Sequence, residues 1–117
     1  MLTRDQRYAA DAIARVQHVR GSADLSSAEY KAMAQELPVM VRSAGLVQAL
    51  TFLQGRSSRA HKQLLDDVAH TLGFAEGAAL VAASRSAHLA EYVRLTERVI
   101  NALQWYKRLA QVELDEQ

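Results

Sequence analysis

Hydrophobic residues recur along this chain with the 3.6-residue period of α-helices, and the most apolar stretch covers residues 37–53, LPVMVRSAGLVQALTFL. Wound as a helix, this stretch has apolar side chains on almost every side, so we expect a buried central helix. Its length of about 17 residues, Gly45 and the charged Arg42 make it too short and too broken to cross a bilayer. Gly45 is either a point of close packing or a bend that divides this helix into two pieces.

Helix-start and helix-stop signals divide the first third of the chain. Thr3 and Gln6 have the spacing of a capping box, and Gly21 marks the end of the helix that they begin. After a polar linker, Ser26 and Glu29 form a second capping box. No segment shows the strict alternation and turn chemistry of a β-hairpin, so the pattern predicts an all-α fold.

The one proline and a later glycine predict further boundaries. Pro38 has no backbone N–H to donate, so we expect the second helix to end there. Pro38 then suits the first turn of the central helix, where a missing N–H costs nothing. A later helix ends at Gly73, with Phe74 placed to fold back in a Schellman contact, and a small Ala-rich helix follows at 76–84.

The longest predicted helix covers residues 87–114, with Ser86 as its cap, and it has two contrasting faces. The face expected to lie in the core carries Leu89, Tyr92, Val93, Thr96, Val99, Ile100, Leu103, Tyr106 and Ala110. The roughly opposite face carries Arg94, Arg98, Asn101, Trp105 and Arg108, with Leu109 and Val112 beside them. The sequence therefore predicts about six helices in one domain, with a buried central helix and a long C-terminal helix.

Trp105 is unusual because its large ring lies opposite the predicted core face. Tryptophan with arginine is typical of a protein-binding hot spot, so Trp105, Leu109 and Val112 are candidates for a protein interface. Arginines in a line with an aromatic ring also suit a nucleic-acid track, and the two uses can coexist. The alternative is that the long helix is covered on both sides and Trp105 is a second core contact.

Composition narrows the class of protein. The 117 residues are 50% hydrophobic and 23% charged, which is typical of a globular protein, and there is no cysteine to form a disulfide or thiolate metal site. The net charge is only +1, but the cations are 11 Arg and 3 Lys, and Arg binds phosphate with a forked geometry. A GC-rich or heat-adapted genome would explain the same bias. The N-terminus lacks the apolar core of a signal peptide, so we expect a cytoplasmic protein.

The chain carries no catalytic or metal-binding pattern that supports an enzyme. It has no phosphate-binding glycine loop, no nucleophile elbow and no pair of histidines four residues apart. His61 and His70 are expected on the polar side of their helix, near Asp66 and Asp67, as surface residues. We therefore expect no catalytic residues, no metal and no cofactor.

The loop at 55–59, GRSSR, leads into a helix capped by Ser57 or Ser58. Backbone N–H groups at a helix start, with Arg56 and Arg59 beside them, could hold a phosphate. The alternative is that this loop is only a solvated helix cap.

Two stretches of the chain resemble a known family. Residues 37–56, LPVMVRSAGLVQALTFLQGR, and residues 92–114, YVRLTERVINALQWYKRLAQVEL, resemble the small subunit of the Cmr complex, the type III-B CRISPR effector. The specific marks are Leu-Pro at 37 and 38, Gly-Leu at 45 and 46, the Leu50 to Leu53 end of that helix, and the Trp105, Lys107, Arg108 ending. The resemblance covers the whole chain in length and helix order, although residues 55–86 match only in helical character.

This resemblance implies a non-catalytic structural role within an antiviral ribonucleoprotein. Copies of the small subunit would stack along a crRNA-guided filament, bridge the backbone subunits to the large subunit, and help line the groove for target RNA. The resemblance brings no tidy contact motif, so the candidate RNA-binding residues are chosen by geometry: Arg94, Arg98 and Arg108 on the long helix, Arg42 on the central helix, and Arg56 and Arg59 in the basic loop. Arg42 has an equal rival explanation as a helix-end or buried ion-pair residue.

Other functions remain compatible with the sequence. The small subunit of the related type III-A complex has similar size and helices. A DNA-binding regulator would use residues 57–73 and their neighbours as a helix-turn-helix, although Asp66 and Asp67 argue against a basic recognition helix. A small helical enzyme using a histidine and carboxylates is a further alternative.

Overall fold

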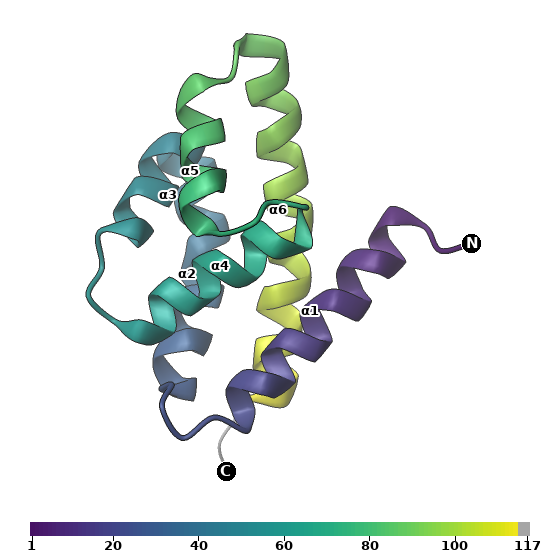
Figure 1. The fold of residues 1–117 in the computed structure, drawn as a ribbon, viewed down its shortest axis with the longest axis vertical. Helices are drawn as coiled ribbons and strands as arrows, with labels where there is room; N and C mark the ends of the chain where they lie inside the picture. Colours follow the sequence, from purple (N-terminus) through teal and green to yellow (C-terminus); the bar gives the residue numbers. More distant parts are fainter. Residues whose placement is uncertain (115–117) are drawn as a thin grey trace.

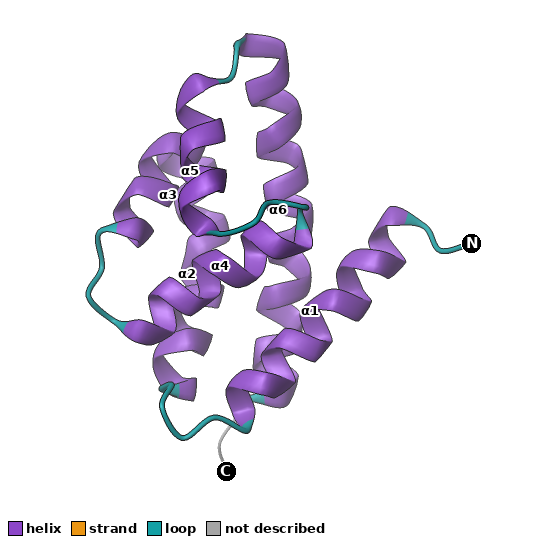
Figure 2. Ribbon diagram, viewed as in Figure 1, coloured by secondary structure: helices purple, strands orange, loops and turns teal. Residues whose placement is uncertain are grey.

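The computed structural model describes residues 1–114, and within that range all regular structure is helical (Figures 1 and 2). The helices are α1 (Arg4–Arg20), α2 (Ser27–Ala44), α3 (Leu46–Gln54), α4 (Arg59–Thr71), α5 (Gly77–Ser86) and α6 (Leu89–Glu113). The predicted all-α fold of about six helices with a long C-terminal helix is therefore confirmed.

Helix α6 is the axis of the bundle. It runs along most of the length of the molecule, α1 and α2 pack against it, and α4 crosses between them with α3 and α5 at one end (Figure 1). The core takes large side chains from each helix, and its fully buried members include Val16, Tyr30, Leu37, Leu50, Leu64, Leu80, Leu103 and Tyr106. Burial of these faces is what stabilises helices of this length, which would be marginal in isolation.

The helix boundary predicted at Pro38 is wrong, and the apolar stretch at 37–53 is divided into two helices, one of the two alternatives left open for Gly45. Helix α2 continues through Pro38, which is buried inside it, and the break falls at Gly45. Gly45 has φ +92°, a conformation that side-chain-bearing residues rarely adopt. It ends α2, where its N–H donates to the Val41 carbonyl (3.0 Å), and it begins α3. Of the two roles suggested for Gly45, the bend is the one observed.

The bend at Gly45 is completed by a residue from the other end of the chain. The hydroxyl of Tyr92 on α6 accepts a hydrogen bond from the Val47 N–H at 3.1 Å. This N–H lies in the first turn of α3, where the helix itself offers no acceptor. The same hydroxyl lies 3.7 Å from where a Cβ on Gly45 would be. A tertiary contact therefore caps α3 at the point where α2 stops.

The start of α6 also differs from the prediction. The N-cap of α6 is His88 and not the predicted Ser86, which is the last residue of α5. Leu89 and Val93, expected in the core, are 79% and 48% exposed, whereas Leu95 and Ala102 are buried. The first turns of α6 extend beyond the N-terminal end of α1 (Figure 1), which agrees with the exposure of Leu89 and Val93. The rest of the predicted stripe, from Val99 to Ala110, faces the core as expected.

The predicted helix starts are largely confirmed. Thr3 and Gln6 form a reciprocal capping box, and the Ser26 hydroxyl accepts from the Glu29 N–H at 3.1 Å. Glu29 does not complete its box, however. Its carboxylate instead accepts from the hydroxyl of Ser58, the N-cap of α4, at 2.6 Å. The second capping signal therefore joins the starts of two helices.

The predicted helix ends at glycine are confirmed as well. Gly21 is the C-cap of α1. Beyond the end of α4, the Phe74 N–H donates to the Ala69 carbonyl at 2.9 Å and the Gly73 N–H donates to the His70 carbonyl at 3.0 Å. These two bonds are the predicted Schellman arrangement.

Candidate nucleic-acid interface

The outward face of α6 carries three of the predicted arginines. Arg94 and Arg108 are exposed, and Arg98 is half-buried. The Arg98 guanidinium donates to the backbone carbonyl of Leu72 at 2.7 Å, so it is held against the end of α4. Fixing one end of a guanidinium lowers the entropy that its remaining donors lose on binding an anion.

Three hollows follow this face of α6. The first, about 400 Å³, lies between α5 and α6 and is bordered by Arg94 and Arg98. The second, about 410 Å³, borders the same two arginines and reaches Arg4 at the start of α1. The third, about 310 Å³, lies beside Trp105 and Arg108. Each hollow therefore has at least one arginine at its border.

Trp105 is half-buried, between the two roles considered for it. Its ring packs against the edge of the core together with Leu109, and its indole N–H donates to the carboxylate of Asp5 on α1 at 3.3 Å. The helix is thus covered by α1 on this side, as the second-core-contact alternative requires, yet part of the ring stays open at the third hollow. Val112 is 72% exposed. An interface role for Trp105, Leu109 and Val112 stays a prediction.

The other three predicted arginines come from different elements. Arg42 is exposed in the last turn of α2, which rules out the buried ion pair and leaves the helix-end role beside RNA binding. Arg56 lies over the ring of Phe52, 5.3 Å from its centroid, and donates to Nδ1 of His61 at 3.3 Å. Arg59 is exposed in the first turn of α4 and lines a separate hollow of about 350 Å³. The geometry thus gathers only the three α6 arginines on one face.

Arg4, which was not among the predicted RNA-binding residues, lies beside the α6 arginines. It borders the second hollow, and its guanidinium lies over the Tyr8 ring at 5.8 Å from the centroid. Arg4 and Arg94 are brought together only by the packing of α1 on α6. No signal in the sequence could have paired them, because the two lie on separate helices far apart in the chain.

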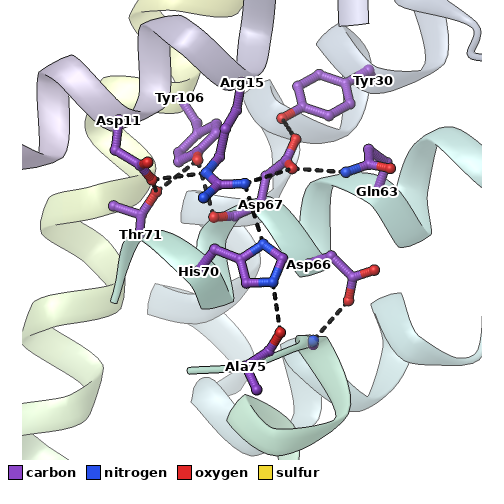
Figure 3. A network of polar contacts seen from close by, with 11 residues as sticks. Asp11, Arg15, Tyr30, Gln63, Asp66, Asp67, His70, Thr71, Ala75 and Tyr106 are labelled. Atoms are coloured by element: carbon purple, nitrogen blue, oxygen red, sulfur yellow. Dashed lines mark hydrogen bonds and ion pairs between the residues drawn. The ribbon is translucent and has the colours of Figure 1, made fainter. Parts of the chain in front are cut away.

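A polar network ties α1 to α4 (Figure 3). The Arg15 guanidinium donates to Asp11 at 2.8 Å and to Nδ1 of His70 at 3.2 Å, and it lies 3.9 Å from Asp67. Because arginine only donates, Nδ1 of His70 accepts, so the neutral ring carries its proton on Nε2, which donates to the Ala75 carbonyl at 2.6 Å.

The carboxylate of Asp67 is the buried end of this network, with only 2% of the residue's surface exposed. It accepts from the Tyr30 hydroxyl at 2.7 Å and from the Gln63 amide at 2.8 Å. The Tyr106 hydroxyl donates to the backbone carbonyl of Asp67 at 3.0 Å and also contacts Thr71 at 2.7 Å. Thr71 in turn donates to Asp11 on α1. Helices α1, α2, α4 and α6 therefore meet at one set of hydrogen bonds.

Burial and hydrogen bonding shift the pKa values of this network in opposite directions. Burial raises the pKa of Asp67, and the hydrogen bonds from Tyr30 and Gln63 offset only part of that rise. Burial also acts to raise the pKa of Asp11, but hydrogen bonds from Arg15 and Thr71, together with the positive charge of Arg15, leave the pKa of Asp11 lowered. Burial raises the pKa of Tyr30 and of Tyr106 above the ordinary tyrosine value.

This network corrects the expected surface placement of α4's polar residues. Asp67 and His61 are buried, His61 being 6% exposed, whereas His70 and Asp66 are not buried. Asp66 accepts from the Gly77 N–H at 2.7 Å. Sequence periodicity alone cannot separate a wet face from one that a neighbouring helix covers, and α1, α2 and α5 all pack on α4. The spacing of polar residues along α4 did not distinguish Asp67 as the buried carboxylate of the network.

Metal binding and membrane insertion find no support in residues 1–114. In this range no group of three or more His, Cys, Asp or Glu side chains could hold a metal ion. Nor does any helix there combine the length and apolar character needed to cross a bilayer.

Known proteins share both this sequence and this fold. The sequence profile of the family described as CRISPR-associated protein (Cas_Cmr5) matches residues 4–113. The CRISPR system Cmr subunit Cmr5 of Thermus thermophilus is 42% identical over 116 residues, which cover 99% of this chain and 100% of that protein. The X-ray crystal structure of a CRISPR-associated Cmr5 family protein from Thermus thermophilus superimposes with a TM-score of 0.92, covering 97% of this chain and 98% of that chain at 42% identity.

The profile match spans helices α1 to α6, and the relative spans nearly the whole chain, so the family extends over the α6 face as well as the core. The resemblance drawn from the two sequence stretches is confirmed, and the type III-A alternative is set aside in favour of type III-B. The chain belongs to the Cmr5 family, the small subunit of the type III-B CRISPR Cmr complex.

Proposed function

We propose that this chain is a non-catalytic, cytoplasmic subunit that assembles with the other Cmr subunits and with further copies of itself, and that its α6 face lines the groove for target RNA beside the crRNA. The observation that carries this proposal is the row of Arg94, Arg98 and Arg108 along one exposed helix face, with a hollow beside each. Arginine binds phosphate through a planar fork, and hollows between arginines leave space for sugars and bases.

The electrostatics favour this role in an assembly rather than alone. A net charge of +1 gives the single chain little long-range attraction for RNA. Phosphate contacts add along a strand, however, so an array of copies would bind a strand more tightly than one copy does. Arg42, Arg56 and Arg59 remain candidates for contacts with RNA elsewhere in such an assembly.

The DNA-binding alternative fits the structure less well. The residues that would supply a helix-turn-helix form one helix, α4, whose Ala60, Leu64 and Val68 are buried. With α1, α2, α5 and α6 all packed on it, α4 cannot enter a major groove.

The test is the salt dependence of target-RNA binding by the assembled complex that carries Arg94→Gln and Arg98→Gln. Each phosphate contact to a single strand contributes about 0.7 to the slope of log K against log salt, so loss of two should flatten it by roughly 1.4 per copy. Arg85→Gln is the matched control, because Arg85 is exposed and is directed to Thr51 and Gln54 on α3. An intact double-variant complex with unchanged affinity and slope would remove this face from the RNA path.

A further inference from the structure

The cleft between α5 and α6 combines small, apolar and cationic side chains. It measures about 400 Å³, and its α5 wall consists of small side chains, Ala83 and Ser86. Leu95, 7% exposed, forms an apolar floor. Small residues on one wall keep the cleft open, and the floor presents an apolar surface that would favour contact with a ring.

The border of this cleft is positive. Arg94 and Arg98 lie one helical turn apart, about 6 Å along the axis, and the contact with Leu72 holds Arg98 in place. Glu91 also lines the cleft, but its carboxylate accepts from the His88 N–H at 3.4 Å, so it is directed to the start of α6. There it offsets the positive end of the helix dipole more than it offsets the arginines.

The same two arginines separate this cleft from the second hollow, and the third hollow follows at Trp105. Two hollows separated by a pair of arginines, with a third hollow beyond Asn101, fit a ligand in which flat rings and phosphates alternate. The α5–α6 cleft has the volume of a small-ligand site, which suits a single base better than a helix of about 10 Å diameter. A base in a duplex is stacked and paired, so only an unstacked base of a single strand could enter.

We propose that the α5–α6 cleft receives one base of single-stranded RNA, with its ring on Leu95 and Ala83 and an adjacent phosphate on Arg94 and Arg98. This inference rests on the proposed function, since it adds a base contact to a face already assigned to RNA. It predicts that bound RNA is locally unstacked at one position for each copy of the subunit.

The experiment fills the cleft without changing its charge. Ser86 is exposed at the mouth, so Ser86→Phe should fold normally and block entry of a base. Ala83→Leu fills the same cleft from its deeper wall. Ala78→Phe is the matched control, because Ala78 is exposed on α5 but does not line the cleft. Folding of each variant is checked by circular dichroism.

Assembled complexes carrying each variant are titrated with single-stranded target RNA containing 2-aminopurine at successive positions. We expect Ser86→Phe to weaken binding about fivefold or more, the lower end of what one stacked base contributes. We also expect a fluorescence increase at one position per subunit, which reports unstacking, in the unmodified and Ala78→Phe complexes but not with Ser86→Phe or Ala83→Leu.

Three outcomes would overturn the inference, and they separate it from the proposed function. If the two cleft-filling variants bind normally while Arg94→Gln with Arg98→Gln binds weakly, phosphate lies on α6 but no base enters the cleft. If folded Ser86→Phe fails to enter the complex, the cleft holds a segment of a neighbouring subunit. If neither the cleft nor the arginine variants change RNA binding, the proposed RNA groove is wrong as well.

Discussion

The hydrogen bond between Tyr30 and Asp67 offers the sharpest test of what stabilises this fold. Tyr30→Phe removes one oxygen from a fully buried ring, so the packing of the core is retained and no large cavity forms. The hydroxyl that is lost donates to a buried carboxylate at 2.7 Å. A hydrogen bond to a charged group contributes about 1.5–3 kcal/mol, and Asp67 would keep only Gln63 and the more distant Arg15 as partners.

We therefore expect Tyr30→Phe to lower the free energy of unfolding by about 2 kcal/mol at neutral pH. For a chain of this length that corresponds to a Tm lower by roughly 8 °C, measured by circular dichroism or urea titration. Tyr8→Phe is the control, because its ring is also buried but its hydroxyl takes no part in the network of Figure 3. We expect a loss of less than about 0.5 kcal/mol there.

The pH dependence of the variant gives a second check. The Tyr30 hydroxyl lowers the pKa of Asp67 against the effect of burial, so its removal should raise that pKa further. Protonation of Asp67 then stabilises the folded variant, and its deficit should shrink as the pH falls toward the ordinary aspartate pKa of about 4. A neutral-pH loss no larger than that of Tyr8→Phe, or a deficit that grows in acid, would refute the reasoning.

Three further predictions follow from named contacts. Tyr30 and Tyr106 have raised pKa values, so the stability that their neutral forms contribute is complete below the ordinary tyrosine pKa of about 10 and should fall as the pH rises beyond it. Urea titrations at alkaline pH would show this, because the stability of Tyr106→Phe should fall less steeply with pH than that of the wild type. Leu50→Ala, a truncation in the core, should lower the free energy of unfolding by about 2–5 kcal/mol, and Trp105→Ala should lower it less in the isolated chain. Trp105→Ala should nevertheless weaken incorporation into the Cmr complex. Equal losses of stability in thermal unfolding would mean that Trp105 is a core residue and not an interface residue. Gly45→Ala should cost about 1–2 kcal/mol in chemical denaturation, because φ +92° strains any side chain, and an unchanged midpoint would contradict a fixed bend.

The arrangement of α6 would allow one small subunit to combine assembly with the RNA binding proposed above. Its arginines face the hollows, whereas Trp105 is held partly against α1 through Asp5. Leu89 and Val93, exposed at the start of α6, and Val112, exposed near its end, leave apolar surface at both ends of the same helix. Exposed apolar groups commonly contact partner proteins, which agrees with membership in a multi-subunit complex.

Much of the fold follows from local sequence. The capping residues Thr3, Ser26 and Ser58, and the Schellman ending at Gly73, mark helix boundaries because they satisfy backbone groups within a few residues of themselves. Such signals lie within a few residues of the backbone groups that they satisfy, so they can be read without knowledge of tertiary contacts. For the same reason, the 3.6-residue period was enough to predict an all-α fold with a long last helix.

Where a contact crosses the molecule, local signals predicted less well. The sequence ended a helix at Pro38 and left a bend at Gly45 as one of two alternatives, whereas in the structure α2 continues to Gly45, where the Tyr92 hydroxyl from α6 caps α3. Periodicity gave Asp67 a wet position, yet the helices packed on α4 bury it, and one of them supplies its partner Tyr30.

The features of the candidate site also separate into those that local sequence predicts and those that depend on helix packing. The sequence alone determined that Arg94, Arg98 and Arg108 share one face of one helix, because a helix fixes the direction of side chains three and four residues apart. Only the tertiary structure decided that Arg4 joins them, that Leu72 holds Arg98, and that small residues on α5 leave a cleft beside them. These depend on how helices pack, which no local pattern records.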